Sequence, residues 1–341
     1  MLRVGIIGCG GITERRHGPV LERLDKQVKV AALADLSPVR TALMGEKLGV
    51  DKAHQYQDWE AMLREEELDL VHICTPHNVH EPQAIAAMQA GAHVLMEKPI
   101  STTIEEANRI IAAAQATGRK LTISHNQRFS PAALAAQKDI EQGMIGTVFL
   151  VRTEAMGRSH VVGRGINQDW RTSASAGGGG PLIDNGYHQI YRTLAWVGSP
   201  VKRVFARVGR YVHKIEVEDM ALLLMEHENG ATTSLQTGWC APGRAIGMEE
   251  IFGTDGQIRV QFGAEKPYAL WTNHTSEWST PAVEMEGPDD LGFSALVKRF
   301  IQAIAEGDAV PVAAEESRHT LAVVQAAYES GKTGQPVDVI S

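Results

Sequence analysis

The sequence predicts two regions of different fold class, an α/β region followed by an α+β region. Up to about residue 124, short runs of Val, Ile and Leu alternate with longer segments of helical periodicity. This alternation is typical of a doubly wound parallel sheet with helices on both faces. Later strand-like runs follow one another across short turns, which predicts a large, mostly antiparallel sheet. The 341 residues are enough for two domains, expected at 1–124 and 125–341.

The first region alternates strands with helices from its start. Strands are expected at residues 3–7, 28–34, 70–74, 92–97 and 120–124. Helices are expected at residues 12–24, 38–48, 58–66, 81–90 and 103–117. Gly49, Gly91 and Gly118 follow three of these helices, where glycine commonly ends a helix.

The second region is richer in strands. They are expected at residues 147–154, 201–212, 219–226, 232–237, 249–253 and 257–262. Asn229-Gly230 and Asp255-Gly256 favour hairpin turns. Apolar residues recurring between Phe293 and Ile304 at helical spacing predict a helix there. A last helix is expected at residues 315–330, ended by Gly331.

Composition excludes several classes of protein. With 33 basic and 41 acidic residues the net charge is −8, and no basic run is present, which argues against a nucleic-acid partner. Cys9, Cys74 and Cys240 form no CxxC pair, so we expect a reducing compartment, the cytoplasm. A core-like run begins at Val4, which leaves no room for a signal peptide, and no apolar run is long enough for a membrane span.

A glycine-rich turn follows the first predicted strand, with the sequence Gly8-Cys9-Gly10-Gly11-Ile12-Thr13. Gly8 permits a tight turn, Gly10 lets the backbone approach a pyrophosphate, and the next helix offers free N–H groups to the anion. Thr13 stands where the usual fingerprint has its third glycine. The turn therefore predicts a Rossmann nucleotide-binding domain, with a glycine turn that binds no phosphate as the alternative.

The end of the second predicted strand carries an acidic residue. Asp35 lies 35 − 10 = 25 positions after Gly10. A carboxylate there accepts both ribose hydroxyls of adenosine and repels a 2′-phosphate, which favours NAD. Arg40 is the residue that would serve NADP instead, and NADP is the less favoured cofactor.

Lys98 stands at the carboxyl end of the strand expected at residues 92–97, in Glu97-Lys98-Pro99. The carboxyl ends of parallel strands border the ligand crevice, and a residue before proline is biased towards an extended backbone. We expect the Lys98 ammonium to contact a substrate hydroxyl and to stabilise negative charge on its oxygen. A solvated surface lysine is the alternative.

The stretch from Gly177 to His188 carries the other candidate group. Its four glycines allow a backbone to lie against a flat ligand. If Pro181 starts a helix, Asp184 and His188 share one face, where a carboxylate and an imidazole suit proton transfer from an alcohol. Asp184 would then raise the pKa of His188. Alternatively Asn185-Gly186 forms a hairpin turn, or the pair is half of a metal site. No third ligand stands at metal spacing, so no metal is expected.

Taken together, these motifs resemble the Gfo/Idh/MocA oxidoreductases, which include inositol and sugar dehydrogenases and glucose–fructose oxidoreductase. The resemblance rests on the glycine turn, Thr75-Pro76 with His80, Glu97-Lys98-Pro99, Gly178-Gly179-Gly180, Asp184-x-x-x-His188 and the ending Ala326-Ala327-Tyr328-Glu329-Ser330. It implies that Lys98, Asp184 and His188 form the catalytic set, with His188 as the general base.

The resemblance also implies which residues contact the cofactor and the substrate. The implied NAD-binding residues are Gly8, Gly10, Gly11, Ile12, Asp35, Thr75, Pro76, His77, His80, Glu97, Lys98, Trp170 and Arg171. The implied substrate-binding residues are Lys98, Arg128, Asn185 and His188. Two positions depart from the family's usual pattern: His77 stands where Asn is frequent, and Thr13 replaces a common Ala.

The expected activity is reversible hydride transfer between NAD and a secondary alcohol of a sugar or polyol. One alternative is an NAD-dependent glycosidase that acts by transient oxidation and elimination. Another is a regulatory protein that senses NAD or a sugar, which the retained Lys98, Asp184 and His188 disfavour. We expect a homodimer or homotetramer, because a sheet with a bare apolar face seeks a partner. The basic residues Arg158, His160, Arg164 and Arg171 either meet an anionic substrate group or lie on a solvated loop, the interpretation we favour.

Overall fold

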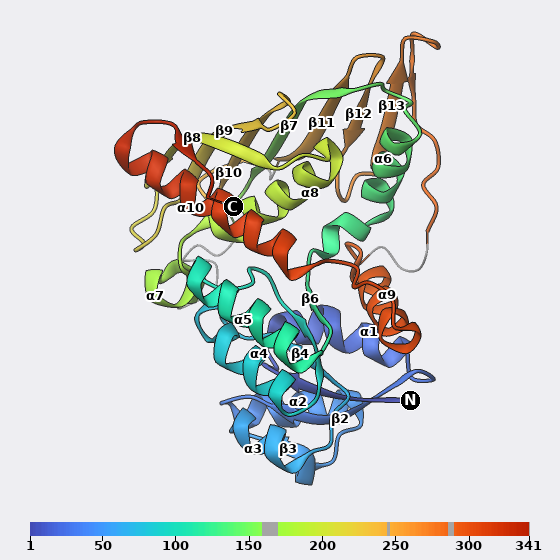
Figure 1. The fold of residues 1–341 in the computed structure, drawn as a ribbon, viewed down its shortest axis with the longest axis vertical. Coiled ribbons are helices and arrows are strands. Elements are labelled where there is room, and N and C mark those ends of the chain that lie inside the picture. The colour runs from blue at the N-terminus through green and yellow to red at the C-terminus, as the bar shows by residue number, and fades with distance from the viewer. Residues whose placement is uncertain (159–169, 244–245, 286–289, 341) are drawn as a thin grey trace. The chain divides into compact units, whose positions relative to one another are not determined.

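The computed structural model describes residues 1–158, 170–243, 246–285 and 290–340. The chain folds into two compact units (Figure 1): the first comprises Met1–Asn126 and Phe293–Arg318, the second Gln127–Gly292 and His319–Ser341. The chain therefore returns to the first unit near its end, whereas the sequence led us to expect residues 293–318 in the second region.

The first unit is built on a six-stranded sheet with the order β3-β2-β1-β4-β5-β6. All of its strand pairs are parallel. The strands are β1 (Leu2–Ile7), β2 (Val28–Ala34), β3 (Gln55–Tyr56), β4 (Leu70–Ile73), β5 (His93–Met96) and β6 (Leu121–Ile123). The predicted parallel sheet is thus confirmed; only β3, which is two residues long and has no periodicity to detect, was not predicted.

The helices of the first unit begin and end largely where the sequence signals stand. They are η1 (Thr13–His17), α1 (Gly18–Arg23), α2 (Pro38–Leu48), η2 (Lys52–His54), α3 (Trp59–Glu65), η3 (His77–Val79), α4 (His80–Gln89), α5 (Ile104–Thr117) and α9 (Phe293–Glu306). A capping box of Thr103 and Glu106 starts α5, and Gly118 ends it with φ +64°. Phe293, Val297 and Phe300 of α9 are buried in the same apolar core as β1 and β2.

The second unit is built on a nine-stranded sheet with the order β14-β13-β12-β11-β7-β10-β9-β8-β15. Its strands are β7 (Val148–Met156), β8 (Val201–Gly209), β9 (Met220–His227), β10 (Thr232–Gly238), β11 (Ile246–Gly253), β12 (Gly256–Val260), β13 (Tyr268–Thr272), β14 (Trp278–Ser279) and β15 (Val337–Asp338). The β7/β10 pair is parallel and the other pairs are antiparallel. This confirms the mostly antiparallel sheet and both hairpins, β9–β10 and β11–β12.

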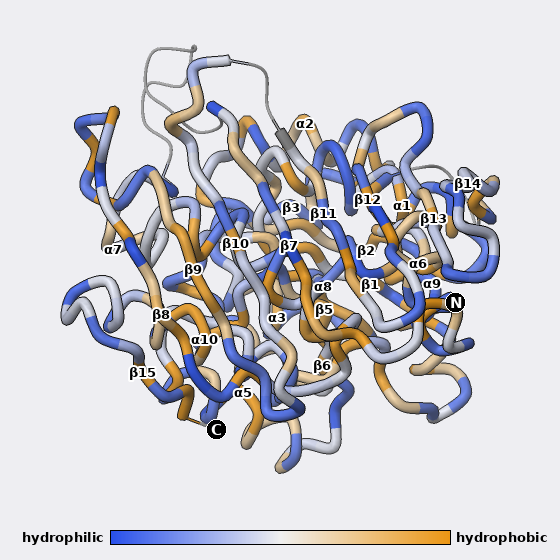
Figure 2. The backbone as a smooth tube through the Cα atoms, turned by 90° about the horizontal axis from the view of Figure 1, so that it is seen from above, coloured by the Kyte–Doolittle hydropathy of each residue, from blue (hydrophilic) through white to orange (hydrophobic). Residues whose placement is uncertain are grey.

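Helices cover one face of this sheet. They include α6 (Pro131–Glu141), α8 (Tyr187–Val197) and the part of α10 (Ala314–Thr333) after residue 318 (Figure 1). Shorter turns are η4 (Asn126–Phe129), η5 (Trp170–Thr172), α7 (Ala174–Gly177) and η6 (Leu182–Gly186). Figure 2 looks onto the other face, over which no described helix passes.

Two helices of the second unit differ from what the sequence led us to expect. Helix α6 was not predicted, because its buried residues are the alanines Ala132, Ala133 and Ala136, which give a weak apolar pattern. Helix α10 does not end at Gly331 but continues to Thr333. A Cβ on Gly331 would lie 3.0 Å from Val208, so this glycine allows close packing against β8. Within the described ranges, no helix combines the length and apolar character needed to cross a bilayer.

Candidate active site

The candidate residues of the first unit follow four neighbouring strands. The segments after β1, β2, β4 and β5 begin at Gly8, Asp35, Cys74 and Glu97, and the sheet order places these strands side by side. Because parallel strands end at the same edge of a sheet, the glycine turn, Asp35, Thr75-Pro76-His77 and Glu97-Lys98 gather at that edge. This is the edge at which doubly wound sheets bind ligands.

The glycine turn has the geometry that a pyrophosphate site requires. Gly8 has φ +94°, and a Cβ there would lie 2.6 Å from the Cys74 carbonyl oxygen. A Cβ on Gly10 would meet no protein atom within 4 Å, so the backbone of the turn is open on that side. The Thr13 hydroxyl donates to the Gly8 carbonyl, so the residue in place of the third glycine closes the turn. These features fit a bound dinucleotide.

Asp35 is held against the same turn. Its carboxylate accepts the backbone N–H of Cys9 at 2.7 Å and that of Ser37 at 2.8 Å. Each carboxylate oxygen has a further lone pair available for a ribose hydroxyl. Burial, with the nearby Asp35 charge, raises the pKa of the Cys9 thiol to about 12, so the thiol stays neutral.

His80 connects two of the turns at this edge. It is fully buried, with Nε2 3.1 Å from the Thr75 carbonyl oxygen and Nδ1 2.9 Å from that of Pro99. Burial lowers its pKa, so the ring is neutral and donates its single N–H to one carbonyl at a time. His80 thus supports the turns that carry Thr75 and Lys98.

A buried ion pair that the sequence did not reveal involves Glu97, the residue before Lys98. His17 Nε2 is 2.9 Å from Glu97 Oε1, and His17 Nδ1 is 3.0 Å from His72 Nδ1. Burial alone would lower the pKa of His17, but Cys74 and Glu97 outweigh it and raise the pKa to about 10. The pKa of His72 is lowered by burial and by the charge on His17, and the pKa of Glu97 is lowered by His17 against the effect of burial. Glu97 therefore forms a buried ion pair with His17 next to Lys98.

Most candidates of the second unit lie on η5, η6 and α8, and Arg128 lies on η4. A π-helical turn begins after Pro181, carries Asp184 and Asn185, and continues directly into α8 with His188. The hairpin alternative for Asn185-Gly186 is therefore wrong, because both residues are helical. Single π-helical turns inside helices are frequent at functional sites.

Asp184 is buried and faces a cation. Its Oδ2 lies 3.6 Å from Arg171 Nε, and the Arg171 guanidinium stacks over the Trp170 ring at 4.3 Å. Asn185 Oδ1 accepts the indole N–H of the buried Trp239 at 2.7 Å. Asp184, Trp170 and Arg171 are thus brought together within the second unit, while Asn185 is held by Trp239.

The glycines before this helix pack against protein. A Cβ on Gly179 would lie 1.9 Å from the Tyr328 hydroxyl, and one on Gly180 would lie 2.2 Å from the Glu218 carbonyl oxygen. The Glu218 carboxylate accepts the N–H groups of Gly180 and Leu182 at 2.9 and 3.0 Å, and the Tyr328 hydroxyl at 2.9 Å. This packing accounts for the two glycines without a flat ligand.

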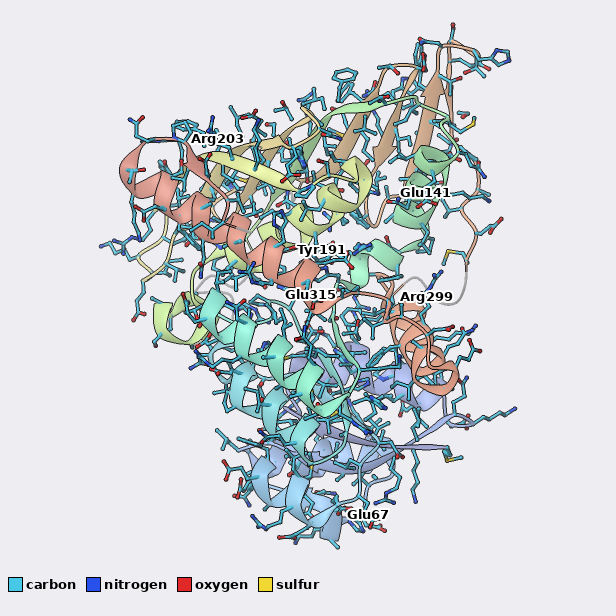
Figure 3. The ribbon with its side chains drawn as sticks, viewed as in Figure 1. Glu67, Glu141, Tyr191, Arg203, Arg299 and Glu315 are labelled. Carbon is cyan, nitrogen blue, oxygen red and sulfur yellow. The ribbon has the colours of Figure 1, made fainter. Side chains whose placement is uncertain are left out.

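His188 lies in a hydrogen-bonded chain. Its Nδ1 is 2.7 Å from the Tyr191 hydroxyl, which also accepts the Gln127 N–H at 3.1 Å. Figure 3 labels Tyr191 on α8. The Gln127 side chain accepts from Arg192, which pairs with the buried Glu249. Arg128, the next residue on η4, is half-buried.

Two other expectations concern this region. His160 and Arg164 lie outside the described residues, and Arg158 is exposed. In the described part of the chain, no group of three or more His, Cys, Asp and Glu side chains is placed to hold a metal ion.

Comparison with known families identifies both units. Residues 2–125 match the model described as the oxidoreductase family with an NAD-binding Rossmann fold, and residues 133–259 match the GFO/IDH/MocA C-terminal domain. The two matches together cover more than half of the chain. The chain belongs to the Gfo/Idh/MocA family. The resemblance drawn from the motifs is confirmed, and this Gfo/Idh/MocA protein is an oxidoreductase with an NAD-binding domain.

Relatives of this family member match it over nearly their whole length. D-glucoside 3-dehydrogenase of Escherichia coli K12 is 27% identical, covering 99% of this chain and 97% of its own. The NADP(+)-dependent scyllo-inositol 2-dehydrogenase of Bacillus subtilis is 28% identical, covering 97% and 94%. Among solved structures, levoglucosan dehydrogenase with NADH superposes with a TM-score of 0.89 at 23% identity, covering 100% and 99%. At this level of sequence identity, the superposition on levoglucosan dehydrogenase supports the fold alone.

Proposed function

We propose that this protein transfers a hydride reversibly between NAD and a secondary alcohol of a sugar or polyol. The observation that carries the proposal is the edge of the first sheet, where the open glycine turn, Asp35 and Lys98 gather. The names of the relatives, which act on glucosides and inositols, support the substrate class.

In the proposed mechanism, NAD supplies the hydride acceptor when bound. The Gly8–Ile12 turn would hold the pyrophosphate, Asp35 the adenosine ribose, and Thr75, Pro76, His77, Trp170 and Arg171 the rest of the dinucleotide. Glu97 and His80 would act indirectly, by supporting the turns that carry Thr75 and Lys98.

The reacting alcohol would meet three side chains. His188 takes the hydroxyl proton at Nε2, which requires the ring proton to sit on Nδ1 and to be donated to Tyr191. Lys98 donates to the same oxygen and stabilises its developing charge. Asp184, restrained by Arg171, orients His188 or a substrate hydroxyl. Arg128 and Asn185 would contact the remaining hydroxyls.

A substrate screen tests this function directly. The purified protein is incubated with NAD and a panel of sugars, glycosides and polyols, and NADH is followed by its absorbance. We expect NADH to accumulate with at least one member. Cleavage of a glycoside without free NADH would instead indicate the glycosidase cycle, and binding without turnover would indicate a sensor.

We propose that NAD is preferred over NADP. The Asp35 carboxylate would lie where NADP carries its extra phosphate, and like charges repel. One relative is named as NADP-dependent, so the preference needs its own test. Calorimetry with both dinucleotides should give the tighter dissociation constant for NAD, and equal or tighter NADP binding would contradict our interpretation of Asp35.

We also propose that the second unit associates with a further copy of the chain. No helix of the described residues covers one face of its sheet, on which Phe205 and Leu224 form a cross-strand pair and are 37% and 51% exposed. An apolar surface of this kind is stabilised by burial in a homodimer or homotetramer.

A further inference from the structure

An ion cluster lies next to the glycine turn and takes no part in the proposed mechanism. Glu14, on η1 directly after the turn, accepts from Arg40 Nη2 at 3.0 Å and from Lys47 Nζ at 2.6 Å. Both cations lie on α2, the helix that follows Asp35. The three side chains are 29–44% exposed, so the cluster faces solvent.

Arg40 is attached to the ribose end of the proposed cofactor site. Its Nε donates to the Cys9 carbonyl at 2.8 Å, while the N–H of Cys9 donates to Asp35 at 2.7 Å. Arg40 and Asp35 therefore bind opposite ends of one residue of the glycine turn. A 2′-phosphate of a dinucleotide whose ribose is bound by Asp35 would enter this neighbourhood.

The charges of Asp35 and of the ion cluster cancel, and this balance leaves aside the Arg15 guanidinium, which lies against Gly11 of the turn. Asp35 and Glu14 carry two negative charges, and Arg40 and Lys47 carry two positive ones. These four side chains would offer a phosphate monoester of about −2 no net positive charge, and two of the three guanidinium nitrogens of Arg40, Nε and Nη2, already donate to Cys9 and Glu14. Since exposed ion pairs contribute little to folding stability, the cluster is not needed to hold α2 in place.

We propose that Glu14 is a specificity-determining residue, whose carboxylate occupies Arg40 and Lys47 and so keeps them from binding the 2′-phosphate of NADP. The inference rests on the proposed dinucleotide function and deepens it. Asp35 would repel the phosphate directly, and Glu14 would withdraw the cations that otherwise offset this repulsion. Loss of the Glu14 charge should therefore relax the choice of cofactor even though Asp35 remains.

The test measures the dissociation constants of NAD and NADP by calorimetry, without any substrate. Glu14→Gln should tighten NADP binding about fivefold to tenfold, because one negative charge near the phosphate is removed. NAD binding should stay within about twofold, since NAD carries no charge at this position. The same Glu14→Gln change made in an Arg40→Leu background should tighten NADP binding much less. The comparison is between the Glu14→Gln/Arg40→Leu double variant and Arg40→Leu alone.

A matched control separates this effect from a general change of net charge. Glu46 is exposed on α2, next to Lys47 but in none of the cluster's hydrogen bonds. Glu46→Gln removes the same charge and should leave the ratio of the two dissociation constants nearly unchanged. Thermal unfolding of each variant verifies folding, and Glu14→Ala serves as a second variant should Glu14→Gln unfold.

The outcomes distinguish this inference from the proposed function. Wild-type protein that binds neither dinucleotide would overturn both. Wild-type protein that prefers NAD, with no gain for NADP in Glu14→Gln, would overturn the role of Glu14 alone. The role of Glu14 would also be overturned if Glu46→Gln tightened NADP binding equally. The same holds if Glu14→Gln tightened NADP binding as much in the Arg40→Leu background as in wild type.

Discussion

Tyr191 is the residue that would determine which nitrogen of His188 is free to take a proton. Its hydroxyl accepts the Gln127 N–H and lies 2.7 Å from His188 Nδ1. In the proposed mechanism the Tyr191 hydroxyl accepts a hydrogen bond from the N–H at Nδ1, which leaves the Nε2 lone pair for the alcohol. The preferred tautomer of a histidine is commonly set in this way by the partner of the other ring nitrogen.

We therefore predict that Tyr191→Phe lowers turnover about tenfold, against about a hundredfold or more for His188→Ala. Both variants should bind NAD normally by calorimetry. The double variant should be no slower than His188→Ala, because a residue that acts through another contributes nothing once that residue is gone. Additive losses in the double variant would show that Tyr191 acts independently of His188.

Lys98 offers a second prediction for a single residue. Lys98→Met keeps most of the side chain's length but removes the charge and the donors. Turnover should fall about a hundredfold, because a donor aimed at developing charge contributes about 3 kcal/mol. NAD affinity should change little, since the pyrophosphate relies on backbone N–H groups. Intact turnover with weakened NAD binding would instead assign Lys98 to the cofactor.

The buried His17–Glu97 pair predicts a pH dependence of stability. The pKa of His17 is raised from 6.5 to about 10 in the folded protein, so the folded state binds its proton more tightly than the unfolded state. The resulting stabilisation is complete below pH 6.5 and is lost as the pH rises through about 10.

Urea unfolding of wild type and His17→Gln at several pH values measures this effect. The difference in the free energy of unfolding between the two proteins should shrink as the pH is raised across that interval. The comparison with the variant cancels the groups titrating at high pH that do not interact with His17, whereas Cys74 and Glu97 are part of the measured effect. A difference that stays constant would mean that His17 is neutral when folded.

At the scale of elements, the start of the helix that carries Asp184 and His188 depends on the close packing of its glycines. The carboxylate of Glu218 replaces the helical partners that the first N–H groups lack. Tyr328 on α10 donates to the same carboxylate, so three segments far apart in the chain meet there.

Gly180→Ala should consequently lower the free energy of unfolding by about 2 kcal/mol, because its Cβ would overlap a backbone atom that cannot move aside easily. Gly247→Ala is the control, since a Cβ there meets no atom within 4 Å. Denaturant titration measures both variants. Equal free energies of unfolding for Gly180→Ala and Gly247→Ala would show that the segment around Gly180 accommodates a Cβ without loss of stability.

At the scale of the whole molecule, the open face of the nine-stranded sheet predicts association. We expect wild type to sediment as a dimer or tetramer and Leu224→Arg to shift towards the monomer, because a charge would replace apolar contact area. Met144→Arg, on a turn outside the sheet and 43% exposed, is the control and should leave the assembly intact. A monomeric wild type would contradict the prediction.

The sequence by itself determined the features that depend on neighbouring residues. The alternation of strands and helices up to residue 124, the glycine turn and the position of Asp35 follow from local periodicity and from the special conformations of glycine. Lys98 could be predicted as a candidate in the same way, from its place at the end of a strand. The helix after Pro181 could be predicted from a proline at its start.

Only the tertiary structure decided which distant residues support these candidates. His17 and Glu97 are 80 positions apart, Gly180 and Glu218 are 38 apart, and Gln127 and Tyr191 are 64 apart. It also returned α9 to the first unit and gave Glu14 its two cationic partners. Such pairs leave no trace in the periodicity of one sequence, because a buried polar side chain is stabilised by whichever partner the fold brings to it, at any separation along the chain.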